Sequence, residues 1–171
     1  MVTFLSRLAL VSALSLTVAT AEAAPALRGN VTVTNKVVTV ADMFDDAGAL
    51  AETAIFSAPA PGTTGQVDIA TIRAAAARVG IANFEANGLN AVTVTRAGMT
   101  VDEATLENLV MTELSTRGLI GPGVNSTIQF SRFIDPIQVS TNGVAVRLES
   151  LRYTKGGRDF SVRFMLADGT Q

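Results

Sequence analysis

The chemistry open to this chain is narrow, because its 171 residues include no histidine and no cysteine. Zinc or copper sites built on those residues are therefore excluded, as are Ser-His-Asp and Cys-His catalysis. Two adjacent carboxylates, Asp45 and Asp46, could in principle hold calcium or act as an acid–base pair. Adjacent side chains usually point apart and no D-x-D-x-D-G loop surrounds them, so we interpret them as a solvated turn.

Three further motifs could bind or be modified. Residues 62–65 (Gly-Thr-Thr-Gly) could cradle an anion, but they lack Walker or dinucleotide spacing and are predicted to be a plain loop. Lys155 and Arg158 flank a predicted hairpin tip that could touch an acidic partner or could simply be solvated. Residues 30–32 and 125–127 match the glycosylation pattern, and the serine of the second lies in no G-x-S-x-G elbow. We therefore predict no enzyme activity and no catalytic, metal or cofactor site, and we assign no partner-binding residue.

The amino terminus indicates export. Residues 1–7 carry one positive charge, residues 8–19 are apolar apart from Ser and Thr, and small residues follow. This is the pattern of a signal peptide spanning residues 1–23, with cleavage after Ala21 or Ala23. The apolar run is shorter than the roughly 20 residues that a membrane-spanning helix needs, so we expect no stable membrane insertion after cleavage.

Charge and composition restrict the partners. The chain has 13 basic and 15 acidic residues, and cleavage after Ala21 removes Arg7 alone, which leaves a net charge of −3. Such a chain lacks the basic excess that phosphate backbones attract, which argues against nucleic acid as a partner. Its 48% apolar content allows an ordinary hydrophobic core without disulfides.

Two helices with start and stop signals are predicted. The first covers residues 69–79, with Asp68 as its N-cap and Gly80 at its end. The second opens with a capping box at residues 100–103 and runs to about residue 117, before Gly118. Their predicted apolar faces are Ile69, Ile72, Ala76 and Val79 in the first, and Leu106, Leu109, Val110 and Leu114 in the second.

Short β-branched segments predict the strands. These are residues 31–33 and 36–40 (as two strands or one hairpin), 55–56, 91–96, 128–130, 137–139, and a hairpin over 144–166. The apolar alternation of that hairpin slips by one near Glu149 and Ser150, which predicts a β-bulge. Residues 41–44 are expected to form a brief helical turn and residues 59–65 a surface loop. The fold class is therefore α+β, with short strands and β-hairpins, two capped helices and a predominantly antiparallel sheet.

The chain is predicted to contain a first α+β module at residues 24–97 and a second, β-rich module with one helix at 98–171. Residues 67–72 and 101–106 resemble each other, since each has Val-Asp before a helix and Ala-Thr within its first turn. Two related modules would explain the similarity, but we favour the simpler explanation that capped helices look alike.

The order of motifs resembles one known family. Residues 38–48 (VTVADMFDDAG) are followed by 55–59 (IFSAP), by 61–65 (PGTTG), by a capped helix and by residues 89–96. This order resembles the amino-terminal part of the flagellar basal-body P-ring formation proteins, especially the longer alphaproteobacterial ones. The resemblance covers residues 34–96 well and the remainder more loosely.

The resemblance implies a periplasmic, non-catalytic chaperone whose partner is the flagellar P-ring subunit. The family also carries a carboxy-terminal β-clip region of the SAF type, for which this chain shows no counterpart. Because residues 166–171 resemble a turn into another strand, we expect a fragment truncated at its carboxyl end or a shortened relative. A β-rich partner could cover the strand edges of an unassembled subunit, and residues 31–40 and 160–166 are the candidate edges.

Two other functions fit the same sequence. One is a periplasmic binding or adaptor module for the cell wall or for a secretion or pilus machine. The other is a hydrolase that uses Asp and Glu alone, which would require two carboxylates converging in a cleft. Oligomeric state is not predicted.

Overall fold

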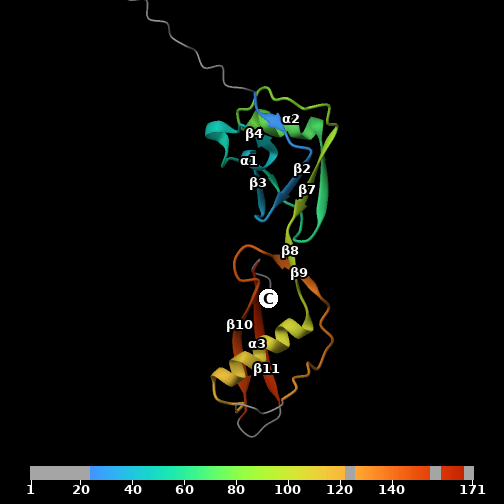
Figure 1. The fold of residues 1–171 in the computed structure, drawn as a ribbon. Coiled ribbons are helices and arrows are strands. Elements are labelled where there is room, and N and C mark those ends of the chain that lie inside the picture. The colour runs from blue at the N-terminus through green and yellow to red at the C-terminus, as the bar shows by residue number, and fades with distance from the viewer. Residues whose placement is uncertain (1–23, 122–125, 155–158, 168–171) are drawn as a thin grey trace, which may run out of the picture.

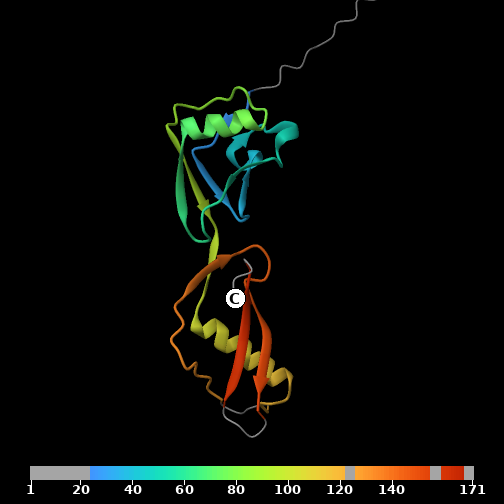
Figure 2. The same cartoon turned by 180° about the vertical axis from the view of Figure 1, so that it is seen from behind.

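The chain forms two lobes, and one segment of the polypeptide connects them (Figure 1). The structure, a computed structural model, describes residues 24–121, 126–154 and 159–167. The first lobe comprises residues 24–97 and the second lobe residues 98–167, and the view from behind shows the same separation (Figure 2). Among the described residues, no helix is long and apolar enough to cross a membrane. The predicted signal peptide, the tip at residues 155–158 and the final residues 168–171 lie outside the described ranges.

The first lobe surrounds its core with short strands and one long helix, α2. The central sheet has the order β2–β7–β6, with β2 parallel and β6 antiparallel to β7, and the pairs β1–β4 and β3–β5 are antiparallel. The elements are β1 (Ala26–Leu27), β2 (Asn30–Val33), β3 (Val37–Thr39), α1 (Val40–Met43), β4 (Phe44–Asp45), η1 (Gly48–Leu50), β5 (Ala54–Ser57), β6 (Thr64–Asp68), α2 (Ile69–Arg78) and β7 (Ala91–Arg96).

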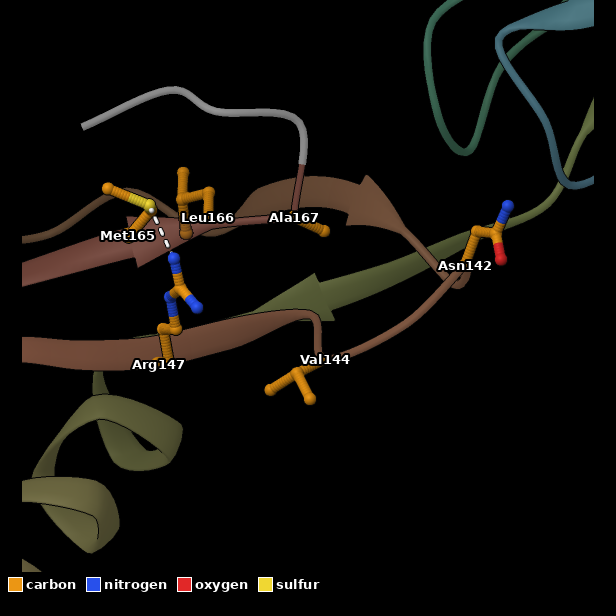
Figure 3. A pocket seen from close by; sticks show the side chains of 6 residues that line it. All are labelled: Asn142, Val144, Arg147, Met165, Leu166 and Ala167. Atoms are coloured by element: carbon orange, nitrogen blue, oxygen red, sulfur yellow. Dashed lines mark hydrogen bonds between the residues drawn. The ribbon is translucent and has the colours of Figure 1, made fainter.

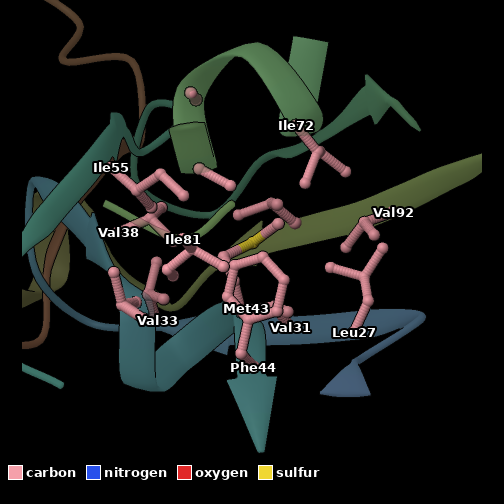
Figure 4. Packing of buried hydrophobic residues seen from close by; sticks show 14 residues of the cluster. Leu27, Val31, Val33, Val38, Met43, Phe44, Ile55, Ile72, Ile81 and Val92 are labelled. Atoms are coloured by element: carbon pink, nitrogen blue, oxygen red, sulfur yellow. The ribbon is translucent and has the colours of Figure 1, made fainter. Parts of the chain in front are cut away.

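One hydrophobic cluster fills the first lobe (Figure 4). Met43, Phe44 and Ile72 are at most 1% exposed, so segments more than 25 residues apart in sequence share one interior. The ring of Phe44 also meets Phe84 edge-to-face, with centroids 5.0 Å apart. The resembling segment, residues 34–96, thus belongs to a single packed unit.

The second lobe is a long hairpin with one helix across it. Its elements are β8 (Gly98–Val101), α3 (Glu103–Thr116), β9 (Ile137–Ser140), β10 (Val146–Tyr153) and β11 (Phe160–Leu166). Strand β8 pairs with β9 and β10 pairs with β11, both antiparallel. Helix α3 lies across the hairpin (Figure 2). It contributes the buried side chains of Leu106, Val110 and Leu114.

Several expectations are confirmed. The fold is α+β, with small, mostly antiparallel sheets. Helix α2 has Asp68 as its N-cap and is followed by Gly80 at φ +95°, a left-handed conformation that glycine adopts without strain. The register of the long hairpin shifts between Leu148 and Ser150, which places the predicted bulge at Glu149.

Other expectations are wrong, and each failed because pairing or packing acts over a long range. For residues 31–33 and 36–40 the alternative of two strands is confirmed and only the alternative of a hairpin is wrong, since β2 pairs with β7 and β3 with β5. Residues 128–130 are not a strand, although Phe130 still packs between Phe160 and Phe164 at 6.4 Å from each ring. Residues 64–65 belong to β6 rather than to a loop, because β7 supplies their backbone partners.

The capping box predicted at residues 100–103 is also wrong. Thr100 lies in β8, and the N-cap of helix α3 is Asp102, two residues further along the chain. The Asp102 carboxylate accepts hydrogen bonds from the Thr105 amide at 2.9 Å and the Thr105 hydroxyl at 2.6 Å. Pairing of β8 with β9 thus keeps Thr100 extended and moves the cap to the next available carboxylate.

The lobes meet around two glycines. The Gly62 amide donates to the Arg96 carbonyl at 2.9 Å, and the backbone of Gly98 packs against Gly62 and the side chain of Gln138. A second contact joins the Ser140 hydroxyl to the Thr34 carbonyl at 3.3 Å. The segment that connects β7 to β8, and with it the two lobes, is therefore held by contacts from β9 and from the loop before β6.

Candidate partner-binding surfaces

The predicted carboxylate pair takes part in a structural contact. The Asp45 carboxylate accepts two hydrogen bonds from the Arg28 guanidinium, at 2.9 Å from Nε and 2.6 Å from Nη2. Both hydrogen bonds end on the same oxygen, Oδ1, and they fasten β4 to the chain that follows β1. Asp46 is exposed at a turn with φ +56°, so the two carboxylates do not act together. Within the described residues, no group of three or more Asp or Glu side chains is placed to hold a metal ion.

The Gly-Thr-Thr-Gly segment has its donors engaged internally. The Thr63 amide donates to the Ala60 carbonyl at 3.1 Å, and the Thr63 hydroxyl donates to the same oxygen at 2.7 Å. The Thr64 hydroxyl shares a hydrogen bond of 3.0 Å with that of Thr95. Since the Gly62 amide is also used within the chain, this segment does not present a ring of free amides to an anion.

The two helix caps are built alike. Asp68 accepts from the Thr71 amide and hydroxyl, as Asp102 does from those of Thr105. For Asp68 the backbone hydrogen bond from Thr71 is the main cause of a lowered pKa, and for Asp102 it is the side-chain hydrogen bond from Thr105. A general acid working near neutral pH needs a raised pKa, so these two carboxylates suit capping rather than acid catalysis.

The candidate strand edges differ in length and setting. The proposed edge at residues 31–40 is divided between two sheets, with β2 at the border of its three-stranded sheet and β3 paired to β5. Within the described residues, β11 pairs with β10 alone and extends over seven residues. Strand β11 is therefore the longest of the candidate edges.

The outer surface of the β10–β11 hairpin carries a basic strip that the sequence analysis did not assign. The inward side chains of β11, from Phe160 to Leu166 at every second position, pack into the core. The register places Met165, Arg163 and Ser161 on the opposite face, next to Arg147, Ser150 and Arg152 of β10. We call Arg147, Arg152 and Arg163 the arginine face.

The bulge creates this arrangement. Arg147 and Arg152 are five residues apart, so in a regular strand they would point to opposite faces. The extra residue at Glu149 restores a common face for both. The slip in the apolar alternation near Glu149 is therefore also the sequence signal that Arg147 and Arg152 share a face.

A recess with a mixed polar and apolar lining lies at one end of the arginine face (Figure 3). It has a volume of about 350 Å³ and is lined by Asn142, Val144, Arg147, Met165, Leu166 and Ala167. Val144 is 71% exposed, and the Arg147 guanidinium donates to the Met165 sulfur at 3.2 Å. A second recess, of about 700 Å³, lies in the first lobe between residues 46–50 and residues 80–83.

Comparison with known proteins gives no support for an assignment from similarity. No protein-family model, curated protein or solved structure matches this chain.

Proposed function

We propose that this protein is a periplasmic, non-catalytic chaperone that assists assembly of the flagellar P ring by binding its subunit. The observation that carries the proposal is the resemblance of residues 34–96 to the P-ring formation proteins. The predicted signal peptide and the absence of histidine and cysteine agree with an exported binding protein.

Strand addition is the proposed mode of binding. A ring subunit that has not yet assembled exposes strand edges and apolar surface, which favour aggregation. Strand β11 offers a seven-residue edge, and an extended segment of the subunit can pair with it through main-chain hydrogen bonds. Polymerisation of the ring would then displace the chaperone from the subunit.

The experiment is deletion of the gene in its motile host, followed by electron microscopy of isolated basal bodies. The proposal expects rods that lack P rings, with rings restored when the gene is supplied on a plasmid. Normal rings and normal swimming in the deletion strain would reject the flagellar function.

A further inference from the structure

We propose that the arginine face and the edge of β11 that no other described strand covers together bind an extended acidic segment with carboxylates at every second residue. The inference rests on the proposed chaperone function and names the chemistry of the partner. Its geometric basis is the pairing register of the hairpin, which gives three successive outward rows of side chains: Arg147 with Met165, Ser150 with Arg163, and Arg152 with Ser161. Each row contributes one arginine.

The spacing of these rows matches another β-strand. Successive outward rows lie two residues apart, which corresponds to about 7 Å along the sheet. A strand added beside β11 has the same repeat, so its alternate side chains fall opposite successive rows. The middle carboxylate of a series at positions i, i+2 and i+4 would therefore face Arg163 of β11 directly. The outer two would lie opposite Met165 and Ser161, one strand away from Arg147 and Arg152 of β10, a gap of about 5 Å that a long arginine side chain can span.

The arginines are poorly satisfied within the described part of the chain. An ion pair on this face joins Arg163 Nε to Glu149 Oε2 at 3.9 Å, and the Arg163 side chain remains 64% exposed. Arg147 donates to a thioether sulfur, a weak acceptor, and Arg152 is exposed. An added carboxylate can thus form charge-assisted hydrogen bonds that the structure does not already supply.

The charges of the second lobe are also separated by element. Strands β10 and β11 carry three arginines against one glutamate, whereas helix α3 carries Glu103, Glu107 and Glu113 and no basic residue. Because the chain is acidic overall, this basic strip is a local feature rather than a consequence of composition. It attracts an anionic partner specifically to the hairpin.

An extended peptide fits better than a helix or a flat anionic surface. A helix has its own main-chain groups paired and cannot use the edge of β11, and a lipid surface offers no amides to it. The apolar part of the recess beside Arg147, formed by Val144, Met165 and Leu166, adds a place for one apolar side chain at that end of the segment (Figure 3). The inferred ligand is therefore an apolar residue followed, at every second position, by three carboxylates.

Binding of a synthetic peptide to the purified full chain tests the inference. The probe peptide has one Leu followed by Asp at alternate positions with Thr between them, and its control has the same composition with the Asp residues adjacent. We expect the alternating peptide to bind at least tenfold more tightly, and to weaken markedly between about 0.05 and about 0.5 M salt. Equal binding of the two peptides would overturn the inference, because it would show attraction by charge alone.

Substitutions locate the site. The double variant Arg152→Glu/Arg163→Glu should lose at least tenfold in affinity, while Arg132→Glu, an exposed arginine outside the hairpin, should change it less than twofold. Far-UV circular dichroism of each variant confirms that it is folded. An equal loss with Arg132→Glu would overturn the inference, and so would binding of phosphatidylglycerol vesicles that competes with the peptide and is as strong.

The two proposals can fail separately. A deletion strain without P rings, combined with no preference for the alternating peptide, would reject the acidic-strand site and keep the chaperone function. Normal P rings, combined with peptide binding that depends on Arg152 and Arg163, would reject the flagellar function and keep the site.

Discussion

Replacing Gly98 with alanine should destabilise the protein through the junction between the lobes. A Cβ atom at this position would lie 2.4 Å from the Gly62 amide nitrogen and 2.7 Å from the Gly62 Cα. Both are backbone atoms, so the clash cannot be relieved by a side-chain rotation. Overpacking of this kind costs about 1–3 kcal/mol of unfolding free energy.

Gly65→Ala is the matched control. The nearest atom to its added Cβ is Pro59 Cβ at 4.0 Å, an ordinary contact, and Gly65 lies within strand β6. Alanine should therefore leave the unfolding free energy unchanged or raise it by up to about 1 kcal/mol, because it lowers the entropy of the unfolded chain.

Urea unfolding followed by far-UV circular dichroism measures both variants, since the chain has no tryptophan to report by fluorescence. Amide NMR spectra should also show that the Gly62 and Gln138 signals move in Gly98→Ala and not in Gly65→Ala. If the two variants agree within about 0.5 kcal/mol and the Gly62 signal is unmoved, the close packing of Gly98 on Gly62 is refuted.

Three further predictions concern the first lobe and the helix caps. Ile72→Ala should lower the unfolding free energy by about 2–5 kcal/mol in urea titrations, because Ile72 is fully buried; a loss below about 1 kcal/mol would contradict its place in the core. Asp45→Asn should cost only about 0.5 kcal/mol, and less at high salt, since the pair with Arg28 is exposed; a large, salt-independent loss would contradict this. Asp68 and Asp102 have a lowered folded-state pKa, so their stabilisation is present above the ordinary value of 3.8 and is lost as the pH falls below it. Thermal melts between about pH 2 and 7 should therefore show a shallower acid decline in the double variant Asp68→Asn/Asp102→Asn, and an unchanged decline would remove the caps as its cause.

Local signals predicted the elements that are fixed locally. Helix α2 was predicted from its cap, its apolar spacing and Gly80, all within a few residues of one another. The bulge at Glu149 was predicted from a slip in alternation within a single strand. In both cases the residues that determine the structure are neighbours in the sequence.

Long-range pairing accounts for the elements that could not be predicted. Strand β6 contains Thr64, Gly65 and Gln66, which favour a loop, and it is extended because β7 pairs with it. Strand β2 finds its partner more than 60 residues away, so its short β-branched run could not reveal that the pairing is parallel. The arginine face depends on which residues of β10 and β11 stand opposite each other, a register that the sequence suggests only through the bulge.

The most direct test of the proposed chaperone function is the behaviour of the purified P-ring subunit as it is diluted from denaturant with and without this protein. The account predicts that an equimolar amount of the protein keeps the subunit soluble, measured by light scattering, and that Arg152→Glu/Arg163→Glu weakens this effect while Arg132→Glu does not. Aggregation of the subunit at the same rate and extent in the presence of the protein would contradict the account.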